Sequence, residues 1–337
     1  MILVTGGTGY IGSHTVVELL GVGEEVLIVD DFSNSSIDVL DRIESITGKK
    51  PDFVELDLVD KAGLENLFQS HPNISGVIHF AAKKAVGESV KNPLLYYRTN
   101  LVSLINLLEV MKNHGVKDLV FSSSCSVYGE PDHTQVTEKT PIKVANSPYG
   151  NTKQICEEII QDTAHATDFK AICLRYFNPT GAHDSAKIGE LPIGVPSNLI
   201  PYITQTGIGL HEQLTVHGGD YDTIDGTCIR DYIHVVDLAQ AHLKALSHLA
   251  NNCTEGSVDI INIGTGNGST VLEVVNTFKE VSGVNLNFKV GPRREGDVIA
   301  VYADATKAKE VLGWEAKLKL KDMLSSAWKW EQKIRNN

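Results

Sequence analysis

The stretch ILVTGGTGYIGSH at residues 2–14 decides the fold. Its apolar start, ILVT, predicts a buried strand. The strand leads at once into Gly6-Gly7-Thr8-Gly9-Tyr10-Ile11-Gly12, a G-x-x-G-x-x-G pattern in front of a predicted helix over 10–20. Glycines permit a tight turn and a close approach to a pyrophosphate, whose charge is stabilised by the N–H groups and positive dipole of a helix N-terminus. The pattern predicts that Gly6, Gly9 and Gly12 form a dinucleotide-binding turn, called here the first glycine turn (residues 6–12).

Further apolar runs follow the first one at regular intervals. They lie at 26–29, 53–56, 77–80 and 119–122, and segments with the 3.6-residue period of a helix, such as 93–114 and 149–166, lie between or after them. Strands of a parallel sheet are buried on both faces and read as continuous apolar runs. The alternation predicts an α/β fold with a doubly wound parallel sheet of the Rossmann type.

A change in composition marks the second half of the chain. A sixth strand at 171–175 runs into YFNPTGAHDSAKIGELPIGVPSN at 176–198, where Gly and Pro cluster. We place a domain boundary near 180, with an NAD-binding Rossmann domain over 1–180 and a smaller α/β substrate domain over 181–337. A helix at 235–249, a strand at 260–263 and a helix near 321–333 are expected in the smaller lobe.

Composition narrows the class of protein. Of the 337 residues, 42% are hydrophobic and 21% charged, which fits a globular chain. The net charge of −12 repels a polyphosphate backbone and disfavours nucleic acid as a partner. Five scattered cysteines without a C-x-x-C pair, a start without a signal-peptide pattern and no apolar run of membrane-spanning length lead us to expect a cytoplasmic protein with reduced thiols and no membrane association.

The second strand indicates which dinucleotide is bound. It ends at Asp30, 18 residues past Gly12. An acid at this position can bind both ribose hydroxyls and repels a 2′-phosphate, so NAD is favoured over NADP.

A second glycine-rich turn, Gly264-Thr265-Gly266-Asn267-Gly268, also stands between a strand and a helix. It lacks a following acid. We interpret this second glycine turn (residues 264–268) as a structural helix entry, capped by Ser269 or Thr270.

Tyr149 and Lys153 are four residues apart, and therefore lie on one helix face one turn apart. An adjacent cation and a positive nicotinamide ring would lower the phenol pKa from its ordinary value near 10 and make Tyr149 a base. Ser124, at the carboxyl end of the fifth strand, is placed to relay a proton to Tyr149. The chain has no G-x-S-x-G elbow and no H-E-x-x-H motif, so neither a serine hydrolase nor a metal site is predicted.

Several strings together resemble the extended short-chain dehydrogenase/reductase family, and most closely the UDP-glucose 4-epimerases. They are TGGTGYIGSH at 5–14, HFAA at 79–82, KAVGES at 84–89, FSSSCSVYGE at 121–130, SPYGNTK at 147–153, LRYFNPTGAH at 174–183, RDYIHVVDLA at 230–239 and PRREGD at 292–297. The resemblance implies NAD-dependent inversion of C4 of a UDP-hexose through a 4-keto sugar, with Ser124, Tyr149 and Lys153 catalytic.

The resemblance also implies binding residues. For NAD, besides the three glycines, these are Tyr10, Ile11, Asp30, Asp31, Phe32, Ser33, Asn34, Ser35, Asp57, Leu58, Phe80, Ala81, Ala82, Lys83, Lys84, Ser124, Tyr149, Lys153 and Phe177. For the sugar nucleotide they are Lys84, Ser124, Tyr149, Asn178, Asn198, Leu199, Arg230, Arg294, Asp297 and Val301. Thr99, included among the NAD residues, stands where these epimerases usually have Asn; its hydroxyl can still donate.

Val301 suggests the sugar range. It falls where the epimerase family has a residue beside the sugar pocket, often tyrosine in similar bacterial forms. A smaller residue is expected to admit 2-acetamido sugars, so we predict activity on UDP-GlcNAc and UDP-GalNAc as well as on UDP-Glc and UDP-Gal.

Two other functions remain open from the sequence. A nucleotide-sugar 4,6-dehydratase or uronate-type relative shares the fold, but such dehydratases place Asp-Glu where this chain has Cys125-Ser126. A non-catalytic NAD-binding regulator usually loses the Tyr or the Lys, and both are present here. The resemblance further implies a homodimer, formed by pairing the helices at 93–114 and 149–166.

Overall fold

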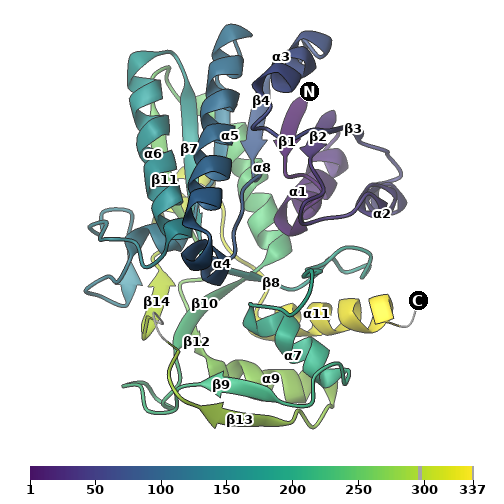
Figure 1. The fold of residues 1–337 in the computed structure, drawn as a ribbon, viewed down its shortest axis with the longest axis vertical. Helices are drawn as coiled ribbons and strands as arrows, with labels where there is room; N and C mark the ends of the chain where they lie inside the picture. Colours follow the sequence, from purple (N-terminus) through teal and green to yellow (C-terminus); the bar gives the residue numbers. More distant parts are fainter. Residues whose placement is uncertain (295–297, 336–337) are drawn as a thin grey trace.

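The computed structural model describes residues 1–294 and 298–335. Its main feature is a parallel sheet of seven strands (Figure 1). In spatial order the strands are β3 (Asp52–Glu55), β2 (Val26–Asp30), β1 (Ile2–Thr5), β4 (Gly76–His79), β5 (Asp118–Ser122), β7 (Lys170–Tyr176) and β11 (Val258–Ile263). The order reverses direction at β1, and ligands of open α/β sheets bind outside the carboxyl ends of the strands at such a point.

Both faces of the sheet are covered by helices because successive strand side chains point to opposite faces. Ile2 and Val4 pack in one core and Leu3 in the other. The first core is closed by α1 (Tyr10–Gly21), α2 (Asp38–Thr47), α8 (Val235–Asn252) and α10 (Thr306–Leu312), and the second by α3 (Lys61–Ser70), α5 (Pro93–Asn113) and α6 (Pro148–Ala166). The doubly wound α/β prediction is confirmed.

A smaller lobe lies beyond the end of the sheet where β7 leads into β8 (Figure 1). One sheet contains β12 (Gly268–Thr270), β10 (Ile229–His234), β14 (Ala300–Ala303) and β6 (Gln135–Val136), with β8 (Asn178–Thr180) paired to β10. A two-stranded sheet of β9 (Leu214–His217) and β13 (Phe288–Gly291) accompanies α7 (Leu199–Gly207), α9 (Val271–Ser282) and α11 (Leu320–Arg335).

The placement expected for two later elements is wrong. The strand at 260–263 belongs to β11, which pairs in parallel with β7 at the edge of the large sheet, and the helix at 235–249 is α8, which packs against α1. Both elements are apolar enough to extend the first core, so the chain returns to the large sheet after entering the smaller lobe. The boundary near 180 remains a prediction.

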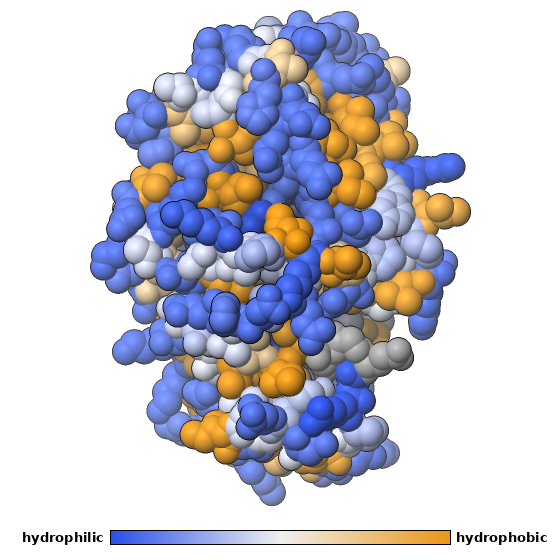
Figure 2. Space-filling view, turned by 90° about the vertical axis from the view of Figure 1, so that its left-hand side faces the viewer, coloured by the Kyte–Doolittle hydropathy of each residue, from blue (hydrophilic) through white to orange (hydrophobic). Residues whose placement is uncertain are grey.

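The surface on the side of α6 is largely hydrophilic, with apolar side chains in separate patches (Figure 2). Within the part of the chain that the structure describes, no helix combines the length and apolar character needed to cross a bilayer.

Candidate active site

The first glycine turn forms a cradle that only glycine permits. Gly6 has φ +69°, and a Cβ there would lie 2.8 Å from the backbone N of Ala81. A Cβ on Gly12 would lie 2.2 Å from the carbonyl oxygen of Gly6. Gly9, the N-cap of α1, offers no side-chain acceptor to the helix N–H groups. The donors and the positive helix end therefore face the cavity that the turn lines, which fits a pyrophosphate.

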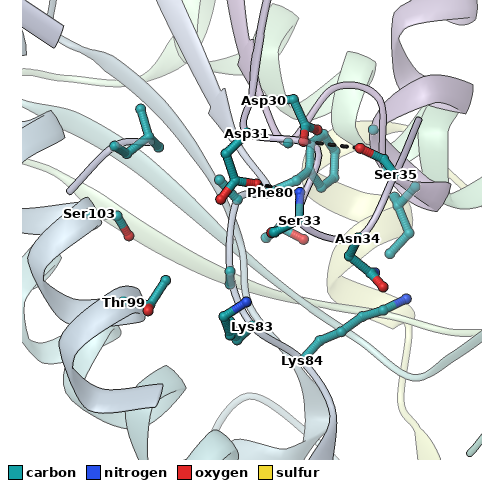
Figure 3. Close-up of a pocket in the computed structure, with 18 of the residues that line it drawn as sticks. Asp30, Asp31, Ser33, Asn34, Ser35, Phe80, Lys83, Lys84, Thr99 and Ser103 are labelled. Carbon is teal, nitrogen blue, oxygen red and sulfur yellow. Dashed lines mark hydrogen bonds between the residues drawn. The ribbon is translucent and has the colours of Figure 1, made fainter. Parts of the chain in front are cut away.

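Asp30 ties the first glycine turn to the loop after β2. Its carboxylate accepts hydrogen bonds from Thr8 N (3.1 Å), Phe32 N (3.0 Å) and Ser35 Oγ (3.1 Å). Figure 3 shows Asp30 and Ser35 on one side of the cavity. These bonds fix the carboxylate at the carboxyl end of β2, where a ribose is expected.

Residues from eight parts of the chain line one continuous cavity. Those expected from the sequence are Gly6, Gly9, Tyr10, Ile11, Gly12, Asp30, Asp31, Ser33, Asn34, Ser35, Asp57, Leu58, Phe80, Ala81, Ala82, Lys83, Lys84, Thr99, Tyr149 and Lys153. Thr99 of α5 faces the cavity (Figure 3). The cavity thus connects the first glycine turn with the Tyr149–Lys153 pair.

Five further lining residues were not expected: Val29, Leu56, Ser103, Ser122 and Tyr176. Four of them lie at or just beyond the carboxyl ends of β2, β3, β5 and β7, and the strand-end rule could have found them. Ser103 follows Thr99 by one turn of α5. Residues four apart lie on one face of a helix, so this spacing could have predicted Ser103.

Three expected cofactor residues lie outside this lining. The Phe32 ring packs against Phe53, with centroids 5.0 Å apart. Phe177 is buried in a cluster with Val127 and Val301. Ser124 does not line the cavity itself, but its hydroxyl lowers the pKa of Tyr149, which does line it.

Tyr149 and Lys153 lie in the first turns of α6. The helix starts with Pro148, and Ser147 Oγ caps it by accepting from Gly150 N (3.2 Å). Lys153 Nζ donates to the carbonyl oxygen of Ser122 (2.7 Å) and lies 4.6 Å from the centre of the Phe121 ring. The ammonium is therefore anchored to the end of β5.

Burial dominates the electrostatics of this pair. It raises the pKa of Tyr149 well above its ordinary value, and the hydrogen bond from Ser124 acts in the opposite direction. Burial also lowers the pKa of Lys153, which Cys156 and Glu157 counteract. The lowering of the Tyr149 pKa expected from the sequence requires additional positive charge at the ring.

The expected substrate residues come mainly from the smaller lobe. Asn178 and Val301 lie on the strands that flank β10, and Val301 pairs directly with Arg230 of β10. Asn198 is the N-cap of α7, Leu199 is the first residue of that helix, and Arg294 follows β13. Asp297 lies outside the described residues.

Asn198 also connects to a half-buried carboxylate. Its Nδ2 donates to Glu190 Oε1 (2.7 Å), and the charge of Lys84 lowers the pKa of Glu190, although burial raises it more. Lys84 extends along the cavity in Figure 3. The structure thus links Lys84 with the start of α7.

The second glycine turn is filled by the protein itself. The Asp231 carboxylate accepts from Thr265 N (3.0 Å), Gly266 N (3.1 Å) and Thr265 Oγ1 (2.6 Å). Thr270 caps α9 in a capping box with Glu273. The prediction of a structural turn is confirmed, with Thr270 as the cap.

Comparisons with known proteins agree with this geometry. A family model described as GDP-mannose 4,6 dehydratase matches residues 3–327. The UDP-glucose 4-epimerase of Bacillus subtilis is 50% identical over 98% of this chain and 96% of its own, and that of Homo sapiens is 49% identical over 98% and 96%.

Solved structures are equally similar. The UDP-glucose 4-epimerase of Stenotrophomonas maltophilia, with bound NAD and formylated UDP-arabinopyranose, superimposes with a TM-score of 0.96 at 47% identity, over 99% of this chain and 98% of that one. The enzyme of Bifidobacterium longum, in complex with NAD⁺ and UDP, gives 0.95 at 46% identity, over 99% of both chains. The chain belongs to the family that the GDP-mannose 4,6 dehydratase model describes and, within it, to the UDP-glucose 4-epimerases.

Proposed function

We propose that this protein is an isomerase that inverts C4 of a UDP-hexose and interconverts UDP-glucose and UDP-galactose with NAD as its cofactor. One observation carries the proposal: the cavity that begins at the open first glycine turn ends at Tyr149 and Lys153. A dinucleotide in this cavity would bring its reactive end to a phenol and an ammonium.

The cofactor would be held by the residues that line the cavity. The first glycine turn would bind the pyrophosphate and Asp30 the adenosine ribose, while Lys153 would bind the nicotinamide ribose. When bound, NAD would supply reversible acceptance and donation of hydride at this end of the cavity.

Tyr149 would act as base and then as acid. Its phenolate takes the proton of the 4-hydroxyl, and a 4-ketopyranose results when C4 loses its hydride. Ser124 donates a hydrogen bond to the phenol oxygen and stabilises the phenolate. When the keto sugar presents its opposite face, C4 would regain its hydride there while Tyr149 returns the proton to the oxygen, and C4 is inverted.

The UDP moiety would remain anchored while the sugar turns. We assign this anchoring to Lys84, Asn178, Asn198, Leu199, Arg230 and Arg294 together with Asp297. The guanidinium groups match a diphosphate in charge and geometry, in a protein whose net charge of −12 would otherwise repel it.

Elimination of water, as in a 4,6-dehydratase, needs an acid and a base beside the serine. Cys125 occupies one of these positions, and burial raises the pKa of its thiol to about 12. A thiol that stays protonated at neutral pH is no base, so epimerisation is the better assignment. A non-catalytic NAD-binding regulator needs no acid or base, so the presence of Tyr149 with Ser124 beside it favours an enzyme.

The experiment is to incubate the purified protein with UDP-galactose without added cofactor and to resolve the products. We expect UDP-glucose, with NAD released on denaturation. Tyr149→Phe should lower turnover by at least roughly 100-fold. Tyr202→Phe, which alters a ring stacked on His211, should leave turnover unchanged. A 6-deoxy-4-keto product would indicate a dehydratase, and no conversion would indicate a regulator.

The sugar range is part of the proposal. Val301 is 9% exposed and packs with Val127 and Phe177, close to the segment that follows Ser124. A side chain this small supports turnover of UDP-GlcNAc and UDP-GalNAc. Val301→Tyr should remove this activity selectively, whereas absence of N-acetyl turnover in the unaltered enzyme contradicts the assignment.

The quaternary state and location are proposed on similar grounds. Leu94 is 81% exposed, and Leu95 and Ile105 are each 40% exposed, all on α5, which packs against α6. These side chains support a homodimer formed through α5 and α6. Sedimentation velocity would measure the oligomeric state and test this. All five cysteines are unpaired in the structure, which supports a cytoplasmic location.

A further inference from the structure

Ser126 lies behind the catalytic Ser124 and contacts its hydroxyl twice. Ser124 is the N-cap of the 3-10 helix η1 (Cys125–Tyr128). Its Oγ accepts hydrogen bonds from Ser126 N (3.2 Å) and from Ser126 Oγ (3.0 Å). A serine hydroxyl has two acceptor lone pairs and one proton to donate. With both lone pairs engaged, Ser124 keeps only its proton for a further partner.

Tyr149 is one group on which this hydroxyl acts, and the Cys125 thiol is another. The Ser124 hydrogen bond lowers the pKa of the Tyr149 phenol, whereas burial and the neighbouring Tyr176 of β7, Cys125 of η1 and Tyr96 of α5 all raise it. Lys153, one helical turn further along α6, donates to Ser122 O. Ser124 is therefore the hydroxyl that opposes burial at the phenol.

The position of Ser126 is fixed by α6. A Cβ on Gly150 would lie 3.2 Å from Ser126 O and 3.5 Å from Ser126 Cβ, so the absence of a side chain at 150 lets η1 approach the helix. Gln154 Nε2 donates to Val127 O and to Lys143 O, both at 2.7 Å. The helix that carries Tyr149 thus also holds the segment that carries Ser126.

We propose that Ser126 is a positioning residue for the acid–base step: its hydroxyl donates to Ser124 and thereby directs the Ser124 proton to the phenol oxygen of Tyr149. The proposal rests on the proposed function of Tyr149. Ser126 exchanges no proton with the substrate. Because its hydroxyl donates to Ser124, Ser124 does not donate to Ser126, an arrangement that would leave the phenolate of Tyr149 without a donor.

The test compares Ser126→Thr, which keeps a hydroxyl, with Ser126→Val, which has the same shape without one, and with Ser126→Ala. Each NAD-loaded enzyme is assayed for kcat and KM across pH. Ionisation of Tyr149 is followed separately by phenolate absorbance, with Tyr149→Phe as the blank. We expect the Val and Ala variants to raise the apparent pKa of Tyr149 by roughly one unit and to lower kcat about tenfold at neutral pH, with KM unchanged. Ser126→Thr should match the unaltered enzyme.

Gln154→Leu is the matched structural control, because it loosens η1 but keeps both hydroxyls. It should lower Tm without moving the pKa of Tyr149. The proposal is overturned if the Val and Thr variants share one pH profile, or if Gln154→Leu shifts the pKa as far as Ser126→Val does. Should Ser126→Ala not fold, the Val and Thr pair decides. Failure to convert UDP-galactose refutes the proposed function, whereas the absorbance titration still tests Ser126.

Discussion

The two glycine turns of this chain have the same local pattern and opposite roles. Each follows a strand and precedes a helix, α1 in one case and α9 in the other. At the first turn the N-cap Gly9 has no side-chain acceptor, and the turn lines the cavity. At the second turn Asp231 accepts the N–H groups of Thr265 and Gly266, and Thr270 with Glu273 caps the helix.

The difference shows what makes a glycine turn a binding site. Both turns offer backbone donors near a helix N-terminus, and such donors bind an anion wherever one is available. Asp231 is the protein's own anion, 0% exposed, and it satisfies the second turn permanently. At the first turn Asp30 accepts only from Thr8 N, and the N-cap Gly9 provides no acceptor for the first N–H groups of α1, which leaves these to a ligand.

The largest effect should come from filling the first turn. Gly12→Ala places a Cβ against the Gly6 carbonyl, so the backbone must move, and we expect loss of copurified NAD and at least a roughly 100-fold loss of turnover. Gly266→Ala is the control: its Cβ would have 3.6 Å to Ala303 O, and the cost is about 1 kcal/mol of backbone strain from φ +72°. NAD content after gel filtration and urea denaturation distinguish them. A Gly12→Ala protein that retains NAD would contradict the comparison.

Weakening the acceptor in the second turn should destabilise the fold. Asp231→Asn removes part of the acceptor set that satisfies Thr265 and Gly266, and we expect a loss of about 3 kcal/mol in the free energy of unfolding. Asp222→Asn, on an exposed side chain, should change it by less than about 0.5 kcal/mol. Equal urea midpoints for the two variants would show that the turn does not depend on its carboxylate.

Acid should act on the region of the first turn through His14 of α1. Burial lowers the pKa of His14 from 6.5 to about 3. Between these values the unfolded state binds a proton and the folded state does not, so stability falls as pH falls, by about 2 kcal/mol at pH 5 relative to pH 7.5. Burial instead raises the pKa of Asp231. In the pH range where this carboxyl titrates, the folded state binds a proton before the unfolded state does, so protonation of Asp231 does not lower the free energy of unfolding.

The measurement is the free energy of unfolding of His14→Gln at both pH values. The variant should lose about 2 kcal/mol of the pH dependence. His217→Gln, on an exposed histidine, should retain all of it. If the two variants have the same pH dependence, His14 is not the group that responds to acid.

The smallest effect concerns the cap of the second turn. Thr270→Ala removes the hydroxyl that accepts from Glu273 N (3.0 Å) and should cost about 1 kcal/mol. Ser269→Ala, one residue earlier in β12, should cost much less. Thermal unfolding of the two variants measures the difference. A larger loss of stability in Ser269→Ala than in Thr270→Ala would show that Thr270 is not the cap.

Much of the site could be predicted because its signals are local. The glycine spacing and the Tyr149–Lys153 interval are patterns within short segments, and Asp30 stands at the end of a predicted strand. Tyr176 and Ser103 lie where the strand-end and helix-face rules place lining residues, but neither residue type by itself marks a binding site. The anchoring of Lys153 to Ser122 O was missed because it joins residues that are 31 positions apart.

The sequence by itself determined the alternation of strands and helices, the two glycine turns, and the residues able to carry the chemistry. Only the tertiary structure decided that β11 returns to the large sheet and that the second turn is closed by its own carboxylate. The physical reason is that spacing along the chain sets local conformation, whereas the occupancy of a donor depends on what lies across from it in space. Asp231 accepts a hydrogen bond from the N–H of Thr265, which is 34 residues away in the sequence, and no local pattern predicts this contact.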